Sequence, residues 1–153
     1  MRQQLQEQGY TLREGWDDVI QRDMEVWYRF TEDRSITHYA WFARRDHRNS
    51  AGFVHGGALT TFLDHCMGSM CWLLTDGGFG WTITLNMQFL RPARVDRWIF
   101  AEVRHLSGTD ANILLAGDLH QGSLEGPRIA LGQGSFTVPG RKAKKSVDTA
   151  TTI

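Results

Sequence analysis

The sequence has little of several features that mark particular protein classes. Its 153 residues contain two cysteines and three prolines, and Lys plus Arg equals Asp plus Glu at 17 each, so the formal net charge is zero. A surface that follows a nucleic-acid backbone needs a basic excess, so this balance argues against nucleic acid as a partner. A small basic patch for one phosphorylated ligand is still compatible with it.

Long apolar runs and leader segments are also missing. The longest apolar stretch, residues 58–74, is slightly short for a bilayer span and contains Asp64 and His65. The N-terminal residues lack the apolar core of a signal peptide. On a helix Cys66 and Cys71 would lie about 140° apart, too far round for a disulfide. We therefore expect a cytoplasmic protein with reduced thiols and no membrane partner.

Patterning predicts one domain, residues 1–140, followed by a polar, disordered tail, residues 141–153. The first 23 residues leave room for a short helix, and one long helix follows His55-Gly56-Gly57 over about 17 residues. Composition, alternation and turn residues predict six strands, at 24–30, 35–43, 81–90, 97–106, 111–120 and 128–138. One helix cannot cover both faces of six strands. We therefore expect an α+β fold in which a curved antiparallel sheet wraps around one long central helix.

The central helix carries an unexpected acid. Its apolar residues recur nearly all the way round, which is typical of a helix buried on every side. Asp64 lies in its middle, where a carboxylate is costly unless it is paired, protonated or taking part in chemistry. Asp64 is therefore the first candidate catalytic residue. The alternative is an Asp that reaches the surface or an interface and forms hydrogen bonds there.

Two glycines precede the helix. Gly56 and Gly57 permit a tight entry turn, and they also leave free N–H groups at the positive end of the helix dipole, where an oxyanion can bind. Gly56 and Asp64 are separated by about 12 Å along one helix. If both act on one carbon, they must come from antiparallel helices of two subunits. A functional interpretation of this helix therefore predicts a homodimer with composite sites.

The residues from Asn49 to Gly57, then Asp64, then the segment TITLNMQFLRPAR at 82–94 follow one another in the order of a known pattern. They resemble the phenylacetyl-CoA-type branch of the hotdog-fold acyl-CoA thioesterases, over roughly residues 24–138. The resemblance implies a hotdog fold and hydrolysis of an acyl-coenzyme A to free acid and coenzyme A, with no cofactor. The motifs of hydratases and dehydratases of the same fold are absent from the sequence.

The resemblance also implies roles for the matched positions. Asp64 corresponds to the general base or nucleophile, and the backbone N–H of Gly56 to the group that polarises the thioester carbonyl. His55 corresponds to a residue that supports this carbonyl site, with Gly57 beside it against the substrate. Asn49 corresponds to the residue that helps to orient water in the opposing subunit.

A Ser or Thr near the attacking water corresponds to Thr82, or to Thr84, which the alternation of this strand puts on the same face. Arg91 and Arg94 follow the strand and suit the phosphates of coenzyme A, although solvated loop arginines are the plainer alternative. The histidines have no metal-ligand spacing and no G-x-S-x-G motif is present, so neither a metal site nor a serine triad is expected.

Several alternatives stay open at this point. The acyl group is undetermined, as is the choice between a dimer and a tetramer of two dimers. A hotdog protein that binds acyl-CoA without hydrolysing it is a second interpretation. A thioesterase that acts on an acyl-carrier protein is a third.

Overall fold

The computed structural model describes residues 2–14, 19–78, 80–109 and 111–138. The expected tail, residues 141–153, lies outside the described residues. The elements in chain order are α1 (Arg2–Glu7), β1 (Thr11–Leu12), α2 (Val19–Asp23), β2 (Trp27–Phe30), β3 (Ile36–Ala43), a 3-10 turn (Arg45–His47), α3 (Gly56–Leu74), β4 (Trp81–Phe89), β5 (Arg97–Gly108), β6 (Asn112–Gln121) and β7 (Arg128–Thr137).

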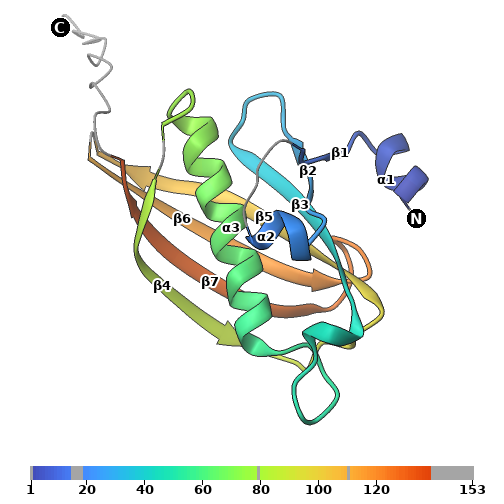
Figure 1. The fold of residues 1–153 in the computed structure, drawn as a ribbon. Coiled ribbons are helices and arrows are strands. Elements are labelled where there is room, and N and C mark those ends of the chain that lie inside the picture. The colour runs from blue at the N-terminus through green and yellow to red at the C-terminus, as the bar shows by residue number, and fades with distance from the viewer. Residues whose placement is uncertain (1, 15–18, 79, 110, 139–153) are drawn as a thin grey trace, which may run out of the picture.

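The strands form one antiparallel sheet that curves around α3 (Figure 1). Its order is β1-β2-β3-β5-β6-β7-β4, so β4 and the short β1 are the two edges. The expected α+β fold is confirmed, as are the hairpin of β2 with β3 and the meander of β5, β6 and β7. The first 23 residues left room for one short helix, and the structure has two there, α1 and α2. The second helix and strand β1 go beyond the prediction, because such short elements leave no periodic signal. Within the described part of the chain, no helix combines the length and apolar character needed to cross a bilayer.

The core lies between α3 and the concave face of the sheet. The inner face of α3 carries fully buried apolar residues that pack on β4, β5, β6 and β7. Part of the sheet under it lacks side chains, because Gly117 and Gly132 are register partners and Gly134 follows two residues later. A Cβ added at Gly117 would come within 2.6 Å of the Leu63 Cδ1 atom. This glycine row lets the helix approach the sheet closely.

We expect Gly132→Ala to destabilise the fold by about 2 kcal/mol, as overpacking of a filled core does. The added Cβ would lie 2.9 Å from the backbone oxygen of Asn86 and 2.9 Å from Leu63 Cδ2, so backbone must shift as well as side chain. Thermal unfolding followed by circular dichroism measures the change. Gln133→Ala, on the exposed side of the same strand, is the matched control and should change stability by less than about 0.5 kcal/mol. Equal melting temperatures for the two variants would contradict the close approach.

Candidate active site

The N-terminus of α3 is capped by the side chain of His55. His55 has extended backbone angles, and its Nδ1 accepts a hydrogen bond of 2.8 Å from the N–H of Gly57. That bond uses the Gly57 amide, so the structure does not leave Gly57 free to bind substrate through its N–H. Gly56 is the first residue of the helix, and the N–H of a first residue has no acceptor within its own helix. Of the two expected amides, Gly56 is therefore the one placed to donate to a ligand.

The loop before α3 is fixed by His47, which is 7% exposed. Its Nδ1 accepts from the backbone N–H of Arg44 at 2.9 Å, so its Nε2 donates to Asp23 at 3.0 Å. The carbonyl of His47 then accepts the N–H of His55 at 2.7 Å. This chain of contacts ties α2 to the residue that caps α3, and it sets where the Gly56 amide points.

Asp64 lies in the middle of α3 and is held by a residue of β4. Thr82 Oγ1 donates to Asp64 Oδ1 at 2.9 Å, and the Asp64 side chain is partly exposed. The structure therefore brings together two residues that the sequence nominated separately. The second carboxylate oxygen, Oδ2, stays available to a water or a substrate.

A β-bulge in β4 separates the two candidate threonines. Thr82 pairs with Phe136 and Thr84 pairs with Ser135, so Ile83 is an extra residue between them. Phe136 and Ser135 are consecutive and point to opposite faces, and cross-strand partners share a face. Thr84 accordingly lies on the convex face, where its hydroxyl is 2.7 Å from that of Ser135. The shared face expected from alternation is thus corrected, and only Thr82 reaches Asp64.

The described residues leave one stripe on the outer face of α3 open. Residues three to four positions apart follow one stripe of a helix, and here the stripe holds partly or fully exposed residues: Gly57, Thr61, Asp64, Gly68 and Trp72. The helix was expected to be apolar and buried all round. Within this single chain only the inner face is core, and the open stripe consists mainly of small and polar residues. Burial of the outer face against a second subunit stays a prediction.

Asn49 organises its own loop. Its Oδ1 accepts hydrogen bonds from the N–H groups of Ala51 and Phe53, at 3.0 and 3.1 Å. The carboxamide oxygen is thereby occupied, which leaves the NH₂ group as the part of the side chain able to meet a water or a partner subunit. Asn49 does not reach Asp64 of its own chain in any recorded hydrogen bond.

Arginines gather near the N-terminal end of α3. Two isolated bridges, Arg48 with Val54 and Phe53 with Arg94, bring Arg48 and Arg94 to either side of one short segment. Arg91 donates to the carbonyl of Arg128, and within the described residues no carboxylate is paired with Arg48, Arg91 or Arg94.

Sequence reasoning did not single out Arg48. Its neighbours Arg44 and Arg45 are bound to Asp23 and Asp96, at 2.8 and 2.9 Å. Nothing in the sequence distinguishes a paired arginine from an unpaired one in this run, because both partners come from distant segments.

A groove of about 510 Å³ opens beside His55 between α2 and α3. Its apolar lining comes from Ile20, Met24 and Ala58, and Thr61 extends it to the open stripe of the helix. The groove therefore borders the open stripe at Thr61, while neither Gly56 nor Asp64 lines it. No three His, Cys, Asp or Glu side chains of the described residues are grouped so as to hold a metal ion.

Gly56 and Asp64 do not meet within this chain. Gly56 and Asp64 belong to the same unbroken helix, so about 12 Å of helix axis separates them. No side chain of the described residues closes that gap. The carboxylate lies on the open stripe and the free amide lies at the N-terminus of the same helix, too far apart to act on one atom.

Comparison with known proteins agrees with this architecture. The Thioesterase superfamily model matches residues 51–115, which include His55, Gly56, Asp64 and Thr82. No curated protein sequence matches the chain.

Solved structures similar to this chain include the PaaI protein from the phenylacetic acid degradation operon of E. coli, with a TM-score of 0.70 and 15% identity over 82% of this chain and 88% of that one. A point mutant of the phenylacetic acid degradation protein PaaI from Thermus thermophilus gives 0.69 and 17% identity, over 79% and 99% of the two chains. A hypothetical thioesterase protein from Streptococcus pneumoniae with coenzyme A gives 0.64 and 16%, over 88% and 98%. Together with the family match, they confirm the hotdog fold and the resemblance to its thioesterases.

Proposed function

We propose that this relative of the hotdog thioesterases hydrolyses acyl-coenzyme A to free acid and coenzyme A, in composite sites between two subunits. The observation that carries the proposal is the placement of Asp64, which Thr82 holds on the open face of α3. At the N-terminus of the same helix the Gly56 amide has no intrahelical acceptor. Thioester hydrolysis needs these two functions, a base or nucleophile and an oxyanion donor.

In the proposed reaction, the thioester carbonyl of a substrate accepts a hydrogen bond from Gly56 N–H of one subunit. Asp64 of the other subunit takes a proton from a water that attacks the carbonyl carbon. The tetrahedral intermediate then collapses, the C–S bond breaks, and the proton passes to the departing thiolate of coenzyme A. Direct attack by Asp64 is the alternative, and single turnover in H₂¹⁸O separates the two by the position of the label.

The proposed pairing of Asp64 with Gly56 fixes where the two-fold axis of the dimer would lie. If Asp64 of one α3 faces Gly56 of an antiparallel partner, opposed residues have numbers that add up to about 120, which puts the axis near Thr60 and Thr61. Thr61 is exposed on the open stripe. The edge strand β4 presents Trp81 and Ile83, which are 64% and 55% exposed, and an unpaired apolar edge is an expected pairing surface. A tetramer would be two such dimers.

We expect Thr61→Arg to produce monomers and to abolish turnover, because a residue at a two-fold axis meets its own copy and two guanidinium groups would face each other. Light scattering coupled to size exclusion gives the mass, and it also distinguishes a dimer from a tetramer in the unaltered protein. Thr61→Ser is the matched control and should keep the assembly. A Thr61→Arg protein that remains dimeric and active would place the interface elsewhere.

The substrate's two ends have separate sites in this proposal. The groove beside His55 offers apolar walls for the acyl group, and Arg48, Arg91 and Arg94 offer guanidinium groups for the phosphates of coenzyme A. Recognition of the coenzyme A phosphates can be tested by comparing the hydrolysis of an acyl-CoA with that of the same acyl-pantetheine, which lacks the nucleotide. A higher KM for acyl-pantetheine with little change in kcat supports phosphate binding by this arginine group.

The function is tested by thiol release from a panel of phenylacetyl-CoA, a hydroxybenzoyl-CoA, and short and medium straight-chain acyl-CoAs. Turnover of any of them supports the proposal, and their ranking gives the acyl class. Binding without turnover favours the non-catalytic acyl-CoA-binding alternative, whereas turnover of an acyl-carrier protein alone favours the third interpretation. The thiols of Cys66 and Cys71 are free and buried, which suits a reducing compartment. We therefore propose the cytoplasm as the location. We also propose that the described residues form one domain.

A further inference from the structure

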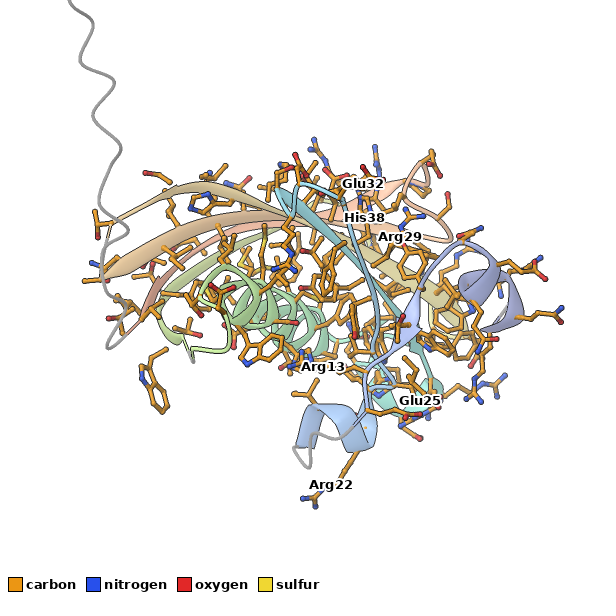
Figure 2. The ribbon with its side chains drawn as sticks, turned by 90° about the horizontal axis from the view of Figure 1, so that it is seen from above. Arg13, Arg22, Glu25, Arg29, Glu32 and His38 are labelled. Carbon is orange, nitrogen blue, oxygen red and sulfur yellow. The ribbon has the colours of Figure 1, made fainter. Side chains whose placement is uncertain are left out.

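A second cavity lies on the convex side of the sheet, away from α3. It has a volume of about 590 Å³ and is formed by α1, the segment that joins α1 to β1, β2, β5 and the turn between β6 and β7. Figure 2 shows Arg29 and His38 on this side of the sheet, with α3 on the other. The cavity is therefore separate from the candidate active site, and the proposed thioesterase chemistry does not use it.

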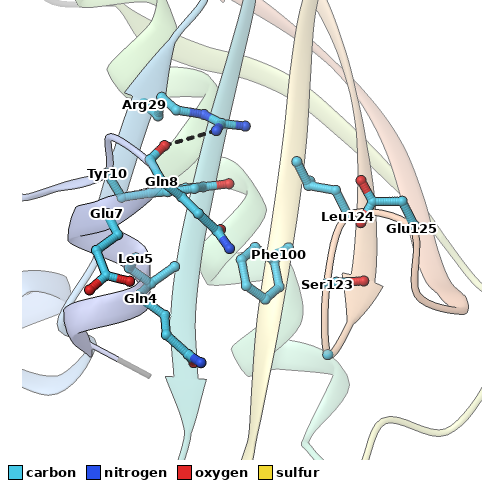
Figure 3. A pocket seen from close by; sticks show the side chains of 11 residues that line it. Gln4, Leu5, Glu7, Gln8, Tyr10, Arg29, Phe100, Ser123, Leu124 and Glu125 are labelled. Atoms are coloured by element: carbon cyan, nitrogen blue, oxygen red, sulfur yellow. Dashed lines mark hydrogen bonds between the residues drawn. The ribbon is translucent and has the colours of Figure 1, made fainter.

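The N-terminal segment creates the cavity. Leu5 and Tyr10 are 1% and 4% exposed, and they pack on a second apolar cluster that includes Trp98 and Phe100 on the convex face. The segment thus covers part of this face and leaves a hollow between itself and the turn at Leu124. Figure 3 shows Leu5, Phe100 and Leu124 among the residues that line the hollow, with Arg29 and Tyr10 above Leu5 and Phe100.

One of these polar groups lacks a partner. The hydroxyl of Tyr10 is buried and has no hydrogen-bond partner among the described residues. Burial raises the pKa of Tyr10 to about 12, an effect that the nearby Arg29 opposes and Glu125 reinforces. The phenol therefore keeps its proton at neutral pH and is available as a donor. A buried donor without an acceptor is destabilising, so a ligand that supplies an acceptor relieves the penalty.

The second group is Arg29, whose guanidinium lies 4.8 Å from the centre of the Tyr10 ring. It is fixed by two acceptors, the carbonyl of Gln8 at 2.9 Å and Nδ1 of His38 at 3.3 Å. The other ring nitrogen of His38 faces Glu102 at 3.3 Å, and burial lowers the pKa of His38, which favours the neutral ring that this pairing needs. No carboxylate of the described residues forms an ion pair with Arg29, so its charge is held in place without a counter-ion.

The rim limits the charge of a ligand. Glu7 and Glu125 are exposed and line the same cavity. They repel a multiply charged anion such as a nucleotide, while one negative charge next to Arg29 is still favoured. The floor of Leu5, Phe100 and Leu124 requires the rest of the ligand to be apolar.

We propose that this cavity binds a monocarboxylate with an apolar body. Its carboxylate lies between the Tyr10 hydroxyl and the Arg29 guanidinium, and its body packs on Phe100, Leu5 and Leu124. The site is independent of the proposed thioesterase activity. A free acid released by thioester hydrolysis belongs to the chemical class that it takes.

The test is a titration of the ¹⁵N-labelled full chain with phenylacetate, followed by amide shifts, beside the neutral phenylacetamide. We expect shifts at Tyr10, Arg29 and Leu124, and binding of phenylacetamide at least tenfold weaker. Shifts confined to α3 and β4 would mean that the acid enters only the candidate active site, and would overturn the proposal. Equal binding of acid and amide would overturn the recognition of the charge.

Two variants with opposite expected effects complete the test. Tyr10→Phe removes a hydroxyl that has no partner, so its melting temperature should not fall, while phenylacetate binding weakens about tenfold, the value of one hydrogen bond to a charged group. Glu125→Gln removes a repelling rim charge and should tighten binding about threefold. If Tyr10→Phe melts normally and binds phenylacetate as well as the unaltered protein, the assignment of Tyr10 as the donor is wrong.

Discussion

Asp64→Asn is expected to lower kcat for acyl-CoA hydrolysis by a factor of about 10³, within the range typical of a lost general base. The amide of Asn keeps the size of the side chain and can still accept from Thr82 Oγ1, which lies 2.9 Å from Asp64 Oδ1. It cannot take a proton from water. Since the shape of the site persists, KM should change much less than kcat. The measurement is steady-state thiol release on the best substrate of the panel.

The matched control for this variant is Asp76→Asn. Asp76 is exposed just beyond the other end of α3 and has φ of 51°, a backbone angle that Asn tolerates well, so activity and stability should stay close to those of the unaltered protein. Thr82→Val should fall between the two, because it removes the hydroxyl that orients the carboxylate and leaves the carboxylate itself. Undiminished turnover in Asp64→Asn would remove Asp64 from the mechanism.

Gly56→Pro should lower kcat by a factor of about 10²–10³, as loss of one oxyanion donor does. The substitution deletes the proposed N–H and little else. Gly56 is the first residue of α3, where proline is well accommodated, and His55 before it has extended angles, with φ of −63° and ψ of 135°, which a following proline favours. Helix content by circular dichroism should therefore be unchanged while turnover falls.

Gly56→Ala distinguishes the loss of the N–H from the steric effect of an added side chain. An alanine Cβ would lie 3.3 Å from Cζ of Phe89, whose ring is 53% exposed and free to move, and the N–H is retained. We expect this variant to lose far less activity than Gly56→Pro. Equal losses would show that crowding against Phe89, and not the amide, explains the effect.

The Asp64→Asn and Gly56→Pro variants, mixed in one dimer, test whether the site is shared between subunits. In a mixed dimer of Asp64→Asn and Gly56→Pro subunits, one site carries both defects and the other carries none. Random pairing of equal amounts restores about a quarter of all sites, so co-refolding two nearly inactive proteins should recover about that share of activity. No recovery, with mixed dimers shown to form, would contradict a site shared between subunits.

The sequence by itself determined more of this protein than its few motifs suggest. Alternation, turns and one apolar stretch were enough for the curved sheet around a central helix, because burial imposes periods of 2 and 3.6 on the chain. Asp64 stood out because a carboxylate in an apolar helix is costly. The eight-residue spacing from Gly56 to Asp64 ruled out a site within one helix, since the rise per residue is fixed.

Other features were decided only by the tertiary structure. Because of the bulge at Ile83, Thr82 faces Asp64 whereas Thr84 faces the convex side of the sheet. The bulge depends on how β4 pairs with β7, which alternation within one strand does not encode. The His55 side chain takes the Gly57 amide, which leaves Gly56 as the donor.

The surroundings of Arg29 and Tyr10 likewise depend on segments that are far apart in the sequence. Among the described residues Arg29 has no ion-pair partner, and His38 of the neighbouring strand β3 accepts from it instead. Tyr10 lies beside Arg29 because the N-terminal segment folds over the convex face. Periodicity reports whether a residue is buried. Which polar group it then meets depends on strand pairing and on segments far apart in the chain, and for that reason the structure was needed to find it.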